Sequence, residues 1–261
     1  MVSAHPIYDT EAITKALAAE GYALVANAIL PEQCTTAREM IDHLAPMGWD
    51  VAHDGNSANP TYVDRYLCVF NRDPYWLSFL DRPGIIAAVE AALGSDCHII
   101  GMTAWRSHPG YHAEPLHTDY VPFEVPRDTP LAYAAPVFIL TVHFYLSDIS
   151  VDLAPTRIVA GSHRTGRAPS AAETLDLGRD AEPVLASAGD ALLFRSDVWH
   201  SGSDNRTAHE VRYLLQVHYG RRQIAQHFSP FMSWRFNSDV LAAASPRQRR
   251  LLGDHEPGAY D

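Results

Sequence analysis

Hydrophobic and polar residues follow one period in the first third of this chain and another in the rest. In the first 95 residues apolar positions recur at helical spacing, and glycine or proline ends or begins each run. A strand-like apolar run over 22–29 interrupts this pattern, and the segment 45–65, rich in Gly, Asn, Asp and Pro, is expected to be a loop. The pattern predicts three helices, over residues 10–20, 31–44 and 83–93.

From Cys97 onwards short β-prone runs are separated by turn residues, and several alternate with the strand period of two. The predicted strands cover 98–103, 137–146, 157–160, 191–194 and 212–219, and a short helix is expected within 245–253. Many short strands in succession favour a jelly roll or barrel over βαβ units. No repeat or linker divides the chain, so we expect one domain over 1–261, with a helical layer packed on a β core.

Composition narrows the classes of partner. The chain has 261 residues, of which 47% are hydrophobic, with a formal net charge of −11. An acidic protein is poorly suited to non-specific binding of nucleic acid or an anionic membrane, so neither partner is expected. The three cysteines are scattered and never in CxxC spacing, which disfavours a disulfide framework or a thiolate zinc site. No secretory pattern opens the sequence and no apolar run has membrane-spanning length, so a cytoplasmic protein is expected.

His117-Thr118-Asp119, with His200 far downstream, is the strongest chemical signal. In a strand, residues i and i+2 point to the same side, so His117 and Asp119 can reach one metal ion. Two imidazoles and one carboxylate form the ligand set of non-heme Fe(II) oxygenases and leave three positions open. The HxD pair alone is weak, because the chain has 14 histidines and zinc also accepts such ligands. Arg212 follows His200 at a place that suits the far carboxylate of 2-oxoglutarate.

Motifs spread over nearly the whole chain strengthen that signal, because they occur in a consistent order. They are Glu20-Gly21-Tyr22 with Leu30-Pro31-Glu32, Trp105-Arg106-Ser107-His108-Pro109-Gly110 with Pro115-Leu116-His117-Thr118-Asp119, Tyr145-Leu146-Ser147-Asp148 with Ala154-Pro155-Thr156-Arg157 and Gly161-Ser162-His163, and Gly189-Asp190 with Trp199-His200, Asn205-Arg206-Thr207 and Arg212. In these blocks the sequence resembles the phytanoyl-CoA dioxygenase family of Fe(II)/2-oxoglutarate-dependent oxygenases.

The resemblance implies a fold that is mainly β with supporting α: a double-stranded β-helix (jelly roll, cupin-like) with N-terminal helices packed on one sheet. Within the single domain, residues 1–95 would supply helical support and a loop, 96–222 the jelly-roll core, and 223–261 a C-terminal extension. It also implies that Fe(II), 2-oxoglutarate as co-substrate and O2 are used. The residues to which it gives roles are His117, Asp119 and His200 as metal ligands and catalytic centre, Arg212 as the clamp for the 2-oxoglutarate C5 carboxylate, and Thr156 as a helper in that site.

Three departures from the family pattern bear on these roles. Leu153-Ala154 replaces the usual Asn-Gly, and Ala160 replaces a proline. One extra residue after Asn205 offsets Arg212 by one, which in a strand would turn its side chain to the other face unless a bulge or longer turn absorbs it. Arg206 is the alternative clamp.

Substrate contacts are expected from the Pro-rich segment after the ligands and from two predicted strands. The candidates are Tyr120, Phe123, His143 and Gln216. The expected reaction is hydroxylation of an unactivated C–H bond of a small metabolite, with release of succinate and CO2. Desaturation, epimerisation or ring formation with the same cofactors is an alternative, as are another mononuclear metal enzyme and a non-enzymatic binding protein on a cupin-like scaffold.

Overall fold

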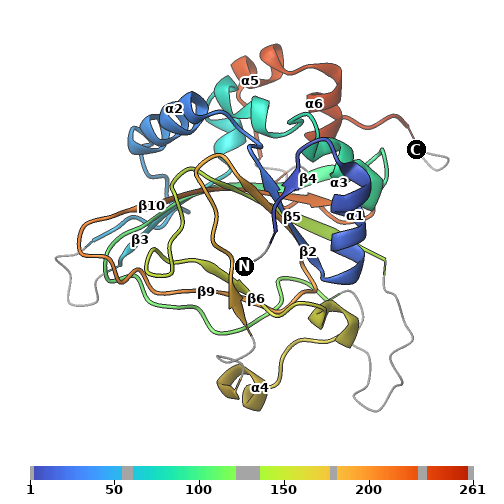
Figure 1. The fold of residues 1–261 in the computed structure, drawn as a ribbon. Helices are drawn as coiled ribbons and strands as arrows, with labels where there is room; N and C mark the ends of the chain where they lie inside the picture. Colours follow the sequence, from blue (N-terminus) through green and yellow to red (C-terminus); the bar gives the residue numbers. More distant parts are fainter. Residues whose placement is uncertain (1–2, 55–60, 122–135, 177–180, 229–233, 258–261) are drawn as a thin grey trace.

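The structure, a computed structural model, describes residues 3–54, 61–121, 136–176, 181–228 and 234–257. Two β-sheets face each other, and helices cover the outer face of the larger sheet (Figure 1). Among these described residues, the larger sheet has seven strands in the order β1-β2-β8-β5-β10-β4-β3, and the smaller has three in the order β7-β6-β9. This is the jelly roll, mainly β with supporting helices, that the sequence led us to expect.

Nearly all neighbours in the sheets are antiparallel, apart from the parallel pair β1 and β2. The strands are β1 (His5–Pro6), β2 (Tyr22–Ala26), β3 (Val63–Leu67), β4 (His98–Ser107), β5 (Ile139–Tyr145), β6 (Thr156–Ile158), β7 (Glu182–Pro183), β8 (Ala191–Arg195), β9 (His200–Gly202) and β10 (Arg212–Gly220).

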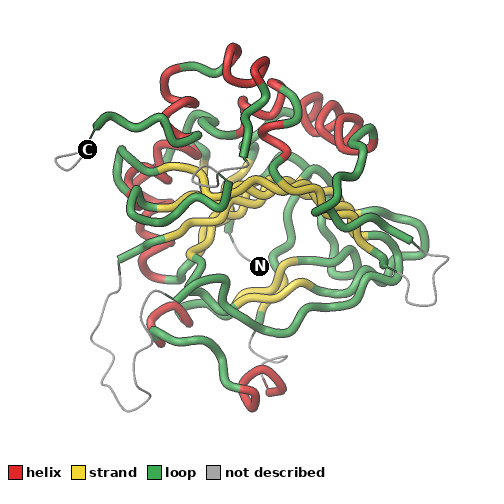
Figure 2. The backbone as a smooth tube through the Cα atoms, turned by 180° about the vertical axis from the view of Figure 1, so that it is seen from behind, coloured by secondary structure: helices red, strands yellow, loops and turns green. Residues whose placement is uncertain are grey.

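The helices lie mostly on one side of the larger sheet, while the smaller sheet lies on the other; the view from behind in Figure 2 shows the same two layers of strands. They are α1 (Thr10–Ala19), α2 (Pro31–Asp42), α3 (Ile85–Leu93), α4 (Ala171–Asp176), α5 (Ser238–Ala243) and α6 (Pro246–Leu251), with 3-10 turns η1 (Val69–Asn71), η2 (Pro74–Phe79) and η3 (Ser162–Thr165). Within the described residues, no helix is long and apolar enough to cross a membrane.

Side-chain alternation in the central strands creates two different interiors. In β10, Leu215 and Val217 belong to the large apolar core between the sheet and the helices, together with Ile13 of α1 and Ile86 of α3. The alternate residues of the same strand point towards the smaller sheet, where polar side chains are gathered. The helix layer therefore supplies most of the apolar burial, and the space between the sheets contains a smaller apolar cluster that includes Leu24, Ile158 and Leu192 beside the polar groups.

The structure corrects the expectation that 45–65 is only a loop, because β3 begins at Val63 and ends at Leu67. This short strand carries adjacent charged residues, Asp64 and Arg65, which disguise its alternation in the sequence. Asp64 is buried on the helix side, whereas Arg65 faces the smaller sheet. Strand β9 and helices α4 and α5 were also not expected from the sequence.

Candidate functional site

His117 and His200 are brought together by the backbone. They form an isolated antiparallel bridge, and their ring centroids lie 4.4 Å apart. His200 begins β9, while His117 lies in an irregular segment after β4 rather than in the strand that the i, i+2 argument assumed. Asp119 Oδ1 is 3.7 Å from His117 Nε2 and 3.5 Å from His200 Nε2. One donor atom from each of the three residues lies within 4.8 Å of the others.

Backbone carbonyls orient both imidazoles. The Nδ1–H of His117 donates to the Pro115 carbonyl at 2.7 Å, and that of His200 donates to the Val198 carbonyl at 3.1 Å. This tautomer directs both Nε2 atoms towards Asp119; metal-ligating histidines commonly donate their other ring N–H to a carbonyl in this way. The donor set of two imidazole nitrogens and one carboxylate fits a six-coordinate non-heme iron ion with three further positions available.

The charge on Asp119 is stabilised by its neighbours. Burial alone would raise the pKa of this carboxyl, but hydrogen bonds from His117 and His200 hold its pKa well below the usual range. Asp119 in turn raises the pKa of His117. A metal ion bound here would displace the protons shared by these groups.

Arg212, the first residue of β10, places a buried guanidinium in the same cavity, of about 310 Å³. The side chain is largely buried, and this burial lowers its pKa. Its Nε has no hydrogen-bond partner among the described residues, and Nη2 has only a long contact of 3.4 Å to Thr156 Oγ1. A buried cation with so few partners is costly, so the site is suited to a carboxylate supplied by a ligand.

A chain of hydrogen bonds runs along the wall of the cavity. The indole N–H of Trp105 donates to Gln216 Oε1, and the Gln216 amide donates to His143 Nε2 at 2.8 Å. His143 Nδ1 is then 3.4 Å from Thr156 Oγ1. Burial and the nearby Arg212 hold the pKa of His143 well below its usual range, so its imidazole is neutral. Because His143 and Arg212 both direct N–H groups at Thr156 Oγ1, the hydroxyl proton of Thr156 is free to donate to a ligand.

The extra residue before Arg212 is absorbed by a hydrogen-bonded turn. Asn205 Oδ1 accepts from the backbone N–H and the hydroxyl of Thr207, and Asn205 Nδ2 donates to the carbonyl of Glu210. Arg212 therefore faces the cavity despite the offset. Arg206 lies on the surface, 61% exposed in its side chain, and pairs with Asp152.

Ala154, which stands where the family usually has glycine, has a backbone conformation typical of glycine. Ala154 has φ of 46°, in the left-handed region, and its N–H donates to the Asp204 carbonyl at 3.1 Å. The turn that presents Thr156 to the cavity is thus formed with an alanine where the resemblance expects glycine.

Only some of the candidate substrate residues line the cavity. His143 and Gln216 line the cavity, and so do Leu214 and His218 on the same face of β10. Tyr120 is half-exposed and its N–H donates to the Ser196 carbonyl; it is not among the cavity-lining residues. Phe123 lies outside the described residues.

Several lining residues were not expected from the sequence. Among them, Tyr111, Glu114 and Arg65 carry polar groups into the cavity lining. Arg65 was assigned to a loop because the segment before it is rich in turn residues. The alternation in Val63–Leu67 is the signal that could have found it.

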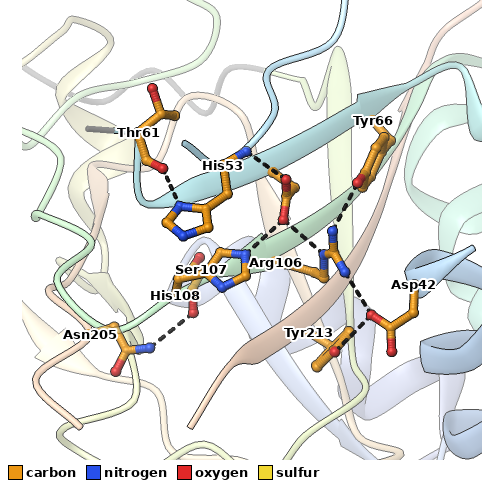
Figure 3. A network of polar contacts seen from close by, with 10 residues as sticks. Asp42, His53, Thr61, Tyr66, Arg106, Ser107, His108, Asn205 and Tyr213 are labelled. Carbon is orange, nitrogen blue, oxygen red and sulfur yellow. Dashed lines mark hydrogen bonds and ion pairs between the residues drawn. The ribbon is translucent and has the colours of Figure 1, made fainter. Parts of the chain in front are cut away.

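A second polar network, on the helix side of the sheet, fixes the strands that carry these residues (Figure 3). The buried Asp64 accepts from the His53 N–H, from Arg106 Nε and from His108 Nε2 at 2.7–2.8 Å. Arg106 also pairs with Asp42 of α2, which accepts from the Tyr213 hydroxyl. The network therefore joins β3, β4, β10 and α2.

Comparison with known proteins identifies the family of this chain. The model of the phytanoyl-CoA dioxygenase (PhyH) family matches residues 17–213. Dioxygenase andF of Emericella variicolor is 28% identical over 193 residues, which are 69% of this chain and 60% of that protein. The chain thus spans less than two thirds of the length of this curated relative.

Solved structures show the same fold. HygX from Streptomyces hygroscopicus, crystallised with nickel, 2-oxoglutarate and hygromycin B, superposes with a TM-score of 0.66 at 16% identity, over 82% of this chain and 88% of that one. The non-heme alpha ketoglutarate dependent epimerase SnoN from nogalamycin biosynthesis gives a TM-score of 0.65 at 18% identity, over 87% of this chain and 92% of that one. With the family model covering most of the chain, the protein belongs to the phytanoyl-CoA dioxygenase (PhyH) family.

Proposed function

We propose that this protein is an Fe(II)- and 2-oxoglutarate-dependent oxygenase that hydroxylates an unactivated C–H bond of a small-molecule metabolite. One observation carries the proposal: two imidazoles and a carboxylate converge in the cavity that also holds a buried guanidinium with almost no partners. Family membership supports it, and so do the cofactors named for the structural neighbours.

His117 and His200 would hold the iron through Nε2, and Asp119 through a carboxylate oxygen. When bound, the iron and the keto acid supply the activation of O2 and the abstraction of hydrogen, with succinate and CO2 as co-products. Arg212 would bind the far carboxylate of 2-oxoglutarate with its planar fork, and the Thr156 hydroxyl would donate a further hydrogen bond. The neutral His143 keeps that hydroxyl oriented without adding a second positive charge.

The choice of outcome depends on the groups around the reacting carbon. Asp119 occupies the ligand position that a halide would need, which favours hydroxylation over halogenation. Desaturation, epimerisation and ring formation start from the same substrate radical and are the alternative outcomes for this site. The structural similarity of this chain to the epimerase SnoN is the reason to retain these alternative outcomes.

Anaerobic titration with Fe(II) and then 2-oxoglutarate tests the proposal. We expect the weak visible charge-transfer band of a keto acid bound to iron, and its loss in His200→Ala. Iron binding without the band would reject 2-oxoglutarate and favour another mononuclear metal enzyme. If no iron binds, the metal site itself is wrong and a non-enzymatic binding protein becomes the better interpretation.

A further inference from the structure

A second, larger hollow adjoins the central cavity beside the end of β3 and the middle of β4. Its volume is about 740 Å³, against about 310 Å³ for the central cavity. Leu67 and Thr103 line both spaces, so the two share a wall. We call it the lateral hollow; its apolar lining includes Met47, Trp49, Met102, Phe228 and Trp234.

The lateral hollow has the surface of a binding site. Trp49 at its rim is 56% exposed and Met47 is 47% exposed, which is unusual for large apolar side chains that lie together. Phe228 and Trp234 pack ring to ring, with centroids 5.3 Å apart, and form a stable wall. An apolar space of this size that joins a polar reaction cavity is suited to the body of a large apolar molecule.

The charged residues around the lateral hollow are few. Although the chain has a net charge of −11, no Asp or Glu is among the described residues that line the lateral hollow. Its cations are Arg72, which pairs with the buried Asp50 at 2.6 Å, and Arg235. A hollow without carboxylates suits an uncharged, apolar part of a ligand, whereas the central cavity contains Arg65 and Arg212 together with Glu114 and Asp119.

Arg65 supplies a cation at the junction of the two spaces. It lies two residues before Leu67 on the same face of β3, in the lining of the central cavity. Its guanidinium lies 5.5 Å above the Trp105 ring, and its buried Nε has no hydrogen-bond partner among the described residues. Arg212 is suited to 2-oxoglutarate, and Arg65 is the second arginine in the same lining, which also contains Glu114.

We propose that the primary substrate is an amphipathic acid, whose apolar body occupies the lateral hollow and whose carboxylate or similar oxyanion pairs with Arg65. The atoms between the two ends then lie at the junction, facing the candidate metal ligands. This inference rests on the proposed function, because it makes the hollow the substrate subsite of that centre.

Binding of a fluorescent apolar acid tests the inference without turnover. cis-Parinaric acid and its methyl ester are titrated anaerobically in the presence of Fe(II) and excess 2-oxoglutarate, so that Arg212 is already occupied. We expect one saturable site for the acid and binding at least about tenfold weaker for the ester, the usual loss for a charge-assisted hydrogen bond. Arg65→Met, which keeps a stem over Trp105, should remove this preference, whereas Arg206→Met on the surface should not.

A second variant tests the hollow itself. A Cβ added at Gly101 would meet only His218 Cδ2, at 3.7 Å, which is an ordinary van der Waals contact, so the backbone accepts a side chain at this position. Gly101→Leu should therefore fill part of the lateral hollow and weaken both probes at least about tenfold by displacing apolar contact. Trp49→Ala should weaken both as well, while Tyr8→Ala, which removes an exposed aromatic elsewhere, should have no effect.

The outcomes separate this inference from the proposed function. The charge-transfer band can develop while the acid fails to bind, or while Arg65→Met and Gly101→Leu bind the acid as tightly as the wild type does. In either case the substrate inference is overturned and the cofactor assignment stands. If the acid binds with the expected dependence on Arg65 and Gly101 while no band develops, the subsite exists but the oxygenase proposal fails.

Discussion

His117 and His200 exchange backbone hydrogen bonds: the amide N of each donates to the carbonyl O of the other at 2.9 Å. The two residues are 83 positions apart in sequence, yet this reciprocal pair fixes the separation of their Cα atoms. The side chains then need only their carbonyl-directed tautomers to point at Asp119. The backbone thus positions both imidazoles of the candidate metal centre.

Removing one imidazole tests this preorganised centre. We expect His200→Ala to lower the affinity for Fe(II) by more than about a hundredfold, because loss of a group that only hydrogen-bonds a metal ligand already costs about ten- to a hundredfold. Isothermal titration under anaerobic conditions measures it. His112→Ala, which removes an imidazole that is 88% exposed, is the matched control and should bind iron as the wild type does. Equal affinity in the two variants would rule His200 out as a ligand.

Arg212 should determine the affinity for 2-oxoglutarate. Arg212→Met is expected to raise the KM for 2-oxoglutarate by about thirtyfold or more, the usual effect of removing one partner of a buried charge pair. Arg212→Lys keeps the charge but loses the two-point geometry, so its KM should lie between those of Arg212→Met and the wild type.

The control for that series is Arg206→Met. Arg206 pairs with Asp152 on the surface, so the substitution should leave the KM unchanged. Succinate formation at varied 2-oxoglutarate measures all of these variants. A rise in KM for Arg206→Met with none for Arg212→Met would reverse the assignment.

Much of the fold was predictable because it depends on local patterns. The alternation in β10 places Arg212, Gln216 and His218 on one face, and these residues line the cavity. What the sequence could not provide is long-range pairing. The bridge between His117 and His200 depends on a three-residue strand, β9, that has no distinctive pattern of its own.

Arg65 shows a second limit of sequence reasoning. Its strand is an edge strand beside a Gly- and Asn-rich segment, and its charged neighbour Asp64 is buried only because Arg106 and His108 bind it. Sequence patterns treat two adjacent charges as exposed, because burial of a charge requires partners that lie elsewhere in the chain. The turn-rich composition of the segment therefore led to the prediction of a loop where the structure has strand β3.

The Asp64 network should contribute strongly to stability. Asp64→Asn keeps the shape but leaves Arg106 and His108 without their acceptor charge, and we expect the free energy of unfolding to fall by about 3 kcal/mol. Asp152→Asn removes an exposed ion pair to Arg206 and should cost less than about 1 kcal/mol. Urea denaturation measures both. Equal losses would mean that the network of Figure 3 is no stronger than a surface ion pair.

Acidification of the same network has a defined direction. Burial would raise the pKa of Asp64, but the bonds from His108, His53 and Arg106 lower it below the ordinary value of 3.8. A carboxyl whose pKa is lowered by folding adds stability above the pKa of the unfolded chain, and that stability is lost as pH falls through the folded value. Below about pH 4, Asp64→Asn and the wild type should therefore converge in stability. A constant difference down to pH 2 would contradict this account.

The C-terminal segment should respond at a higher pH through a pair of histidines. His98 Nε2–H donates to the Ile224 carbonyl at 2.7 Å, so its Nδ1 accepts from His255 Nε2 at 2.8 Å. Burial lowers the pKa of both imidazoles below the ordinary 6.5. The folded state therefore favours the neutral forms, and their contribution is complete above the unfolded pKa and declines as pH falls below it.

We accordingly expect the wild type to lose stability between pH 7 and pH 5, because a proton on His98 Nδ1 would face the N–H of His255. His98→Gln, which cannot titrate, should have a flatter dependence of the free energy of unfolding on pH. His112→Gln, which removes an exposed histidine, should retain the wild-type slope. Urea denaturation at a series of pH values measures the slopes. If His98→Gln keeps the full wild-type slope, the loss of stability originates elsewhere and the histidine pair is not the acid-sensitive contact.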